Sequence, residues 1–171
     1  MKKREDNTLW RGLLFIEKAI IMIACAGTTI VVAAACILRV FNINLIGFEE
    51  ILIMIAFWLY MIGCAYGSYE KSQITADILE VMMPEGLPKG ILRLLRNIIA
   101  TVLGIVFLYW AYKLVLWTIE MDTRTPVFRI PVTIGQGSIF VGLFLVSFYN
   151  IVYLYDEVKL FTAKYIKKTM M

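Results

Sequence analysis

The chain has no histidine, and no acidic or basic residue lies near the middle of any of its four long apolar segments. The lack of histidine excludes bis-histidine haem, as in a cytochrome anchor, and it also excludes histidine-bound zinc and histidine proton relays. Ionisable residues inside a membrane usually mark an ion or substrate pathway. Because the segment centres lack them, the sequence predicts a subunit that supports a larger membrane partner.

Cysteine is scarce, and catalytic motifs are missing. The three cysteines, Cys25, Cys36 and Cys64, lie within apolar segments without metal-ligand spacing, as small packing residues do. The sequence has no motif for nucleophilic catalysis, phosphate binding or metal ligation. We therefore predict no catalytic residues, no enzyme activity, no metal site and no cofactor.

The chain contains several long apolar segments. Of its 171 residues, 61% are hydrophobic, and a helix that spans a membrane needs roughly 20 apolar residues. Four segments qualify, at about 13–38, 46–68, 97–118 and 130–155. The first is longer than the roughly 7–15 apolar residues of a cleavable signal peptide, so we expect it to be retained. The prediction is a single all-α membrane domain over residues 1–171.

Basic residues predict the orientation. Twelve of the 17 lysines and arginines lie before the first span, between the second and third spans, or after the fourth, and Lys18 lies just inside the start of the first span, which makes 13 on one side; three lie in the two other loops. The remaining one, Lys113, lies in the third span, near its outer end, where we expect it to snorkel; pairing with an acid of a partner helix is the alternative. The positive-inside rule places both termini in the cytoplasm. This bias explains the net charge of +4 without a nucleic-acid partner.

Between the second and third spans, residues 72–83 are too short and too polar to cross a membrane. Their apolar residues recur at the spacing of one helix face: Ile74, Ile78, Val81 and Met82. This pattern predicts an amphipathic helix in the cytoplasmic membrane interface. Lys89, Arg93 and Arg96 follow, and we expect them to contact phospholipid headgroups.

The second span carries a candidate contact face. Glu50, Met54 and Trp58 follow one another at intervals of four residues, and Gly63 and Gly67 form a GxxxG pair. Small residues at this spacing let two helices approach closely, within this chain or against a partner. The run Gly135-Gln136-Gly137-Ser138 in the fourth span predicts a second close approach of two backbones.

Three charged positions complete the candidate residues. We expect Glu49 and Glu50, at the outer start of the second span, to pair with Arg39 or with a partner; cation coordination by the two acids is the alternative. Glu17 lies in the first turns of the first span, where we expect it to remain solvated. An alternative function, an autonomous homodimeric transporter, would need Glu17 as its titrating acid.

With this layout, the order of residues resembles the small, four-helix (Q-type) membrane subunit of TRAP transporters, the tripartite ATP-independent periplasmic transporters. The resemblance covers about residues 10–155 and rests on these residues, in chain order: Arg39-Val40-Phe41, Gly47-Phe48-Glu49-Glu50, Trp58 and Gly63, Gln73-Ile74 with Asp77, Met83-Pro84, and Thr125-Pro126 with Ile130-Pro131 and Gly135 or Gly137. Two positions depart from the family pattern: Gln73 stands where histidine is frequent, and Thr133 where tryptophan is common. Their fine roles stay open.

The resemblance implies an inner-membrane protein that packs against a large membrane subunit. A periplasmic binding protein would deliver an organic anion, such as sialic acid or a C4-dicarboxylate, and sodium bound to the large subunit would drive uptake. For such a subunit we expect partner contacts at the following residues: Arg39, Glu49, Glu50, Met54, Trp58, Gly63 and Gly67.

Overall fold

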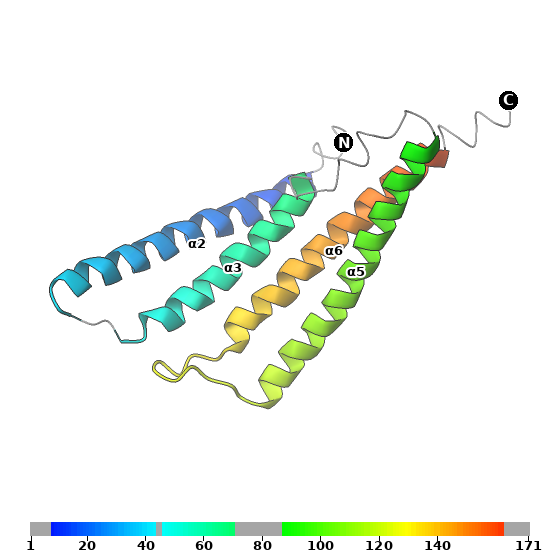
Figure 1. The fold of residues 1–171 in the computed structure, drawn as a ribbon. Coiled ribbons are helices and arrows are strands. Elements are labelled where there is room, and N and C mark those ends of the chain that lie inside the picture. Colours follow the sequence, from blue (N-terminus) through cyan, green and yellow to red (C-terminus); the bar gives the residue numbers. More distant parts are fainter. Residues whose placement is uncertain (1–7, 44–45, 71–86, 163–171) are drawn as a thin grey trace, which may run out of the picture.

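The computed structural model of the chain describes residues 8–43, 46–70 and 87–162. Four helices make up most of this part: α2 (Thr8–Val40), α3 (Phe48–Glu70), α5 (Leu87–Glu120) and α6 (Thr133–Phe161) (Figure 1). Each is long and apolar enough to cross a membrane, which confirms the prediction of four spanning helices. The predicted interfacial helix at 72–83, with Ile74, Ile78, Val81, Met82 and Gln73, lies outside the described residues, as do the first seven and last nine residues of the chain.

The helices are longer than the predicted spans. α5 has 34 residues, which at 1.5 Å per residue is about 51 Å, against a hydrocarbon thickness of about 30 Å. Its first three turns carry Lys89, Arg93 and Arg96. Proline in the first turn, here Pro88, loses no helical hydrogen bond, which suits this helix start.

Two helix starts differ from the prediction because of local backbone geometry. Residues 130–132 belong to a loop and not to the fourth helix, since the Val132 N–H donates to the Thr123 carbonyl over 3.0 Å and the Thr125 N–H to the Ile130 carbonyl over 3.0 Å. The second helix begins at Phe48 rather than at residue 46, because Gly47 has a left-handed φ of +88°.

The helices lie in a row. α2 packs on α3, α3 on α6, and α6 on α5 (Figure 1). α3 and α6 run in the same direction, because Met54 meets Gly135, Met61 meets Gly142 and the Tyr153 hydroxyl donates to the Tyr69 carbonyl. Because α6 contacts both α3 and α5, it lies between them.

The buried core of this row is thin and partly polar. Thr118 and Ser138 are fully buried, and their hydroxyls donate to carbonyls of their own helices, Leu114 and Gly135. Internal pairing of this kind is what a low-dielectric environment demands. By contrast, many large apolar side chains on all four helices are exposed, so this surface requires lipid or another protein to cover it.

Candidate subunit interface

The face of α3 that carries Met54 and Trp58 packs within the chain. A Cβ atom at Gly135 would stand 2.8 Å from Met54 Sδ. The Trp58 indole donates from Nε1 to the Ile134 carbonyl over 3.1 Å. The close approach predicted for the run 135–138 is therefore present, and its partner is α3. The partner contact predicted for Met54 and Trp58 gains no support from this geometry.

Among the glycines of the described helices, Gly142, which the sequence analysis missed, lies closest to the backbone of another helix. A Cβ atom there would lie 2.7 Å from the Met61 carbonyl oxygen and 3.0 Å from its carbon. Gly135, Ser138 and Gly142 are all buried and are spaced by three and four residues. This spacing of small residues was the sequence signal that could have predicted the seam.

Gly63 behaves differently from the glycines of the seam. A Cβ atom at Gly63 would meet nothing within 4 Å, and the same holds for Gly137. Gly63 is therefore not needed for helix packing inside this chain, and its part of α3 remains available to a partner or to lipid. Gly67, one turn further along α3, is partly exposed.

Glu50 ties the loop 121–132 between α5 and α6 to the start of α3. Its Oε1 accepts the Val127 N–H over 2.7 Å, and its Oε2 accepts the Phe128 N–H over 2.9 Å. The loop then closes over Gly47, where a Cβ atom would lie 2.7 Å from Phe128 Cε2. Only glycine meets both the left-handed φ and the lack of space. Glu50 is thus a structural anchor of this chain, which favours the structural interpretation of the acid pair over cation coordination.

This anchor predicts a clear difference between the two neighbouring acids. Glu50→Ala removes the acceptor of two charge-assisted hydrogen bonds, so we expect faster proteolysis of the loop 121–132 in the detergent-solubilised protein. Glu49→Ala is the matched control, because Glu49 is exposed and accepts no hydrogen bond from that loop. Equal proteolysis of the two variants would contradict the anchoring role.

Arg39 lies in the last turn of α2, at the helix carboxyl end, where a cation is favoured. Asn42, with φ 57°, ends the helix: its N–H donates to the Arg39 carbonyl over 3.1 Å, and the Ile43 N–H donates to the Leu38 carbonyl over 3.0 Å. Within the described residues, Arg39 forms no ion pair with Glu49 or Glu50, so the predicted pairing inside the chain is not formed. Arg39 and Glu49 are both exposed.

Toward the other ends of these helices, α2 and α6 meet through Glu17. Its side chain has an exposed fraction of 2%, so the prediction that it remains solvated is wrong. Glu17 Oε1 accepts the Tyr149 hydroxyl over 2.6 Å, and Oε2 has no hydrogen-bond partner. The rings of Trp10, Tyr69 and Phe148 lie 5.6 to 5.8 Å from the Tyr149 ring. These aromatic side chains come from three helices and exclude water where the sequence position alone suggested access.

Lys18, the next residue, remains exposed. Its ammonium lies 5.3 Å from the centre of the Tyr66 ring, whose hydroxyl donates to Glu70. No group of three or more candidate metal ligands occurs in the described part of the chain. At this end of the helices, Glu17 and Tyr149 thus form a buried acid–tyrosine pair beside the exposed Lys18, and these residues hold α2 against α3 and α6.

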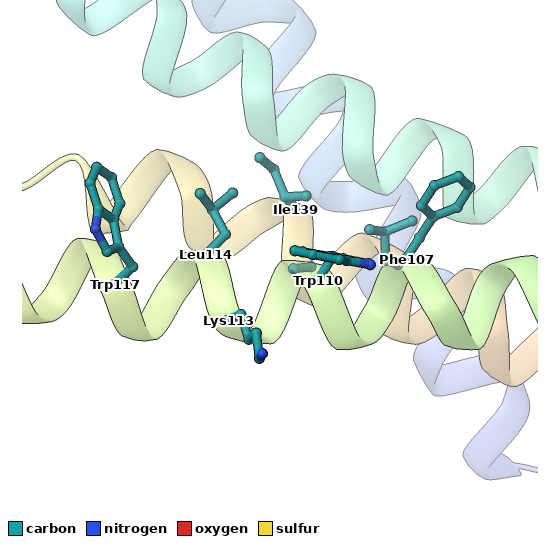
Figure 2. A pocket seen from close by; sticks show the side chains of 8 residues that line it. Phe107, Trp110, Lys113, Leu114, Trp117 and Ile139 are labelled. Carbon is teal, nitrogen blue, oxygen red and sulfur yellow. The ribbon is translucent and has the colours of Figure 1, made fainter.

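An apolar groove of about 500 Å³ lies along α5 and α6. Figure 2 shows Leu114, Trp117 and Ile139 directed to one side, and Lys113 directed to the other. The Lys113 ammonium lies 4.9 Å from the centre of the Tyr109 ring. The full set of lining residues is Phe107, Trp110, Ala111, Lys113, Leu114, Trp117, Ile139 and Leu143. The sequence analysis did not identify this groove, because its walls come from two helices.

With this geometry in hand, the chain can be compared with known proteins. Residues 28–160 match the family described as "Tripartite ATP-independent periplasmic transporters, DctQ component". Comparison with curated proteins gives no match. DctQ is a transporter-component family and not an enzyme family, and its members are inner-membrane components. The four helices that can span a membrane agree with a multi-pass inner-membrane protein. Because the match covers most of the sequence, the chain belongs to the DctQ component family, as a small subunit of a TRAP transporter.

Proposed function

We propose that this chain is a non-enzymatic scaffold subunit that packs against the large membrane subunit of its transporter. The observation that carries the proposal is the family match over residues 28–160. The row of four helices supports it, because a single layer leaves wide apolar faces that a partner can cover. Glu17, the acid that an autonomous homodimeric transporter would need, is bonded to Tyr149 and buried. We therefore do not propose that alternative.

The substrate and energy source belong to the same proposal. The transporter would take up an organic anion, with sialic acid and C4-dicarboxylates as examples of the carboxylates concerned. A periplasmic binding protein would deliver this anion, and sodium bound by the large subunit would drive its uptake.

Phospholipid is the other partner that we propose. Lys89, Arg93 and Arg96 occupy the first three turns of α5. A helix of about 51 Å exceeds the hydrocarbon thickness of about 30 Å, so its first turns must lie among the headgroups or the helix must tilt. Three basic side chains at this level would attract anionic lipids.

Affinity purification of this chain from its native membrane in mild detergent tests the scaffold role. We expect a large multi-span protein to be recovered in about equal amount, as a permanent complex of two membrane subunits requires. Reconstitution of that complex should give carboxylate uptake that depends on sodium and on the binding protein. Recovery of this chain only as a homo-oligomer would overturn the proposal.

Arg39 provides a second test of assembly. Its side chain is exposed and forms no ion pair with the acids that start α3. We therefore expect Arg39→Ala to lower recovery of the large subunit while leaving the thermal unfolding of this chain unchanged. Arg124→Ala is the control, because Arg124 pairs with Asp122 over 3.1 Å within the chain's own loop. Unchanged recovery with Arg39→Ala would remove Arg39 from the interface.

A further inference from the structure

The groove along α5 and α6 is a hollow lined by large, rigid aromatic side chains. Trp110 and Trp117 are 63% and 51% exposed, and they are seven residues apart, which is about two helical turns or 10 Å. Ile139 and Leu143 contribute the α6 side of the groove. Exposed tryptophan around an apolar hollow is typical of the energetic centre of a protein interface.

The depth of the groove restricts what can fill it. Lys113 and Trp117 lie in the last turns of α5, which ends at Glu120, and Phe107 lies about 20 Å from that end at 1.5 Å per residue. The groove therefore extends from the outer interface into the hydrocarbon region. A polypeptide at this depth must satisfy its own backbone hydrogen bonds, so it enters as an α-helix with an apolar face.

Lys113 favours an acidic residue on that helix. An ammonium group inside a membrane span is costly unless it is paired or reaches the interface. The Lys113 ammonium contacts the faces of Tyr109, at 4.9 Å, and Trp110, at 6.0 Å. In the described residues it has no carboxylate partner. The Lys113 ammonium is directed away from Leu114 and Trp117 (Figure 2), although the residue lines the groove. An acidic side chain on the incoming helix would therefore reach this cation at the rim of the groove.

We propose that this groove receives a transmembrane helix of the large membrane subunit, with an acidic residue of that helix opposite Lys113. The proposal rests on the proposed function, and it adds a partner contact on α5 and α6 to the one tested at Arg39. The α3 face that holds Met54 and Trp58 already packs against α6, whereas the groove on α5 and α6 is open.

Photo-cross-linking in the native membrane tests the identity of the occupant. A benzophenone amino acid is placed at Trp110, which lines the groove, and at Leu116, which has an exposed fraction of 41% and does not line it. We expect an adduct with the large subunit from position 110 and none from position 116. An adduct of position 110 with a second copy of this chain, or with phospholipid alone, would overturn the proposal.

Filling the groove gives an independent readout. Leu114→Trp adds bulk inside it, and Leu116→Trp adds the same bulk at almost the same depth outside it. We expect Leu114→Trp to lower recovery of the large subunit by about tenfold, as loss of one interface hot spot does. Leu116→Trp should leave recovery unchanged. Equal recovery with both variants would contradict the assignment.

Lys113→Gln removes the positive charge beside the groove and keeps a side chain of similar size. We expect weaker recovery of the large subunit from this variant, with thermal unfolding of the chain alone unchanged. Full recovery would exclude the acidic partner residue. If the wild-type chain recovers no large subunit, the proposed function itself fails. If the wild-type chain does recover it, a negative result at positions 110, 113 and 114 rejects the groove alone.

Discussion

We expect Gly142→Ala to destabilise the helix row, although alanine is the stronger helix former. A Cβ atom at this position would stand 2.7 Å from the Met61 carbonyl oxygen and 2.8 Å from Met61 Cβ. The obstacle is largely backbone, so a side-chain rotation cannot relieve it, and α3 and α6 must move apart. Overpacking of this kind costs about 1–3 kcal/mol in free energy of unfolding. Thermal unfolding in detergent, followed by tryptophan fluorescence, measures this loss.

Gly137→Ala is the matched control on the same helix. A Cβ atom at Gly137 would meet nothing within 4 Å, so the substitution adds a methyl group without a clash. Replacing glycine by alanine within a helix gains up to about 1 kcal/mol in helix propensity. We therefore expect no loss of stability from Gly137→Ala. If Gly142→Ala unfolded at the same temperature as Gly137→Ala, the tight α3–α6 seam would be rejected.

The four helices could be predicted from the sequence because the membrane leaves few alternatives. An apolar run of roughly 20 residues must satisfy its backbone internally, so it forms a helix whatever its neighbours are. The start of α6 at Thr133 could not be predicted in this way. It depends on a loop whose N–H groups at Val127 and Phe128 are held by Glu50 of another helix.

The candidate site was less predictable, because burial in this chain arises between helices. Glu17 was expected to be solvated from its place near a helix end, and that inference ignores the rings of Trp10, Tyr69 and Phe148. Gly142 was missed because the sequence analysis considered only the run 135–138, although Ser138 and Gly142 are small residues four positions apart. The open space at Gly63 is visible only once the neighbours of α3 are known.

The second large effect that we expect is a loss of stability when the hydrogen bond between Glu17 and Tyr149 is removed. Tyr149→Phe removes one hydroxyl and keeps the ring that stacks beside Trp10 and Tyr69. Glu17 is 2% exposed and its Oε2 has no partner, so the variant leaves a buried carboxyl group without any hydrogen bond. Leaving a buried polar group unsatisfied costs roughly 1–3 kcal/mol, and more if the group is charged. We expect a loss of at least this size in the free energy of unfolding.

Ser147→Ala is the control for that loss, because it deletes a hydroxyl two residues away on the same helix. Ser147 is also buried, but its Oγ has no hydrogen-bond partner, so its removal should cost nothing. Replacing both members of a buried pair by apolar groups is nearly neutral. The double variant Glu17→Leu/Tyr149→Phe should therefore be more stable than Tyr149→Phe alone. If Tyr149→Phe and Ser147→Ala unfold alike, the hydrogen bond between α2 and α6 does not stabilise the row, and Glu17 must be stabilised by some other contact.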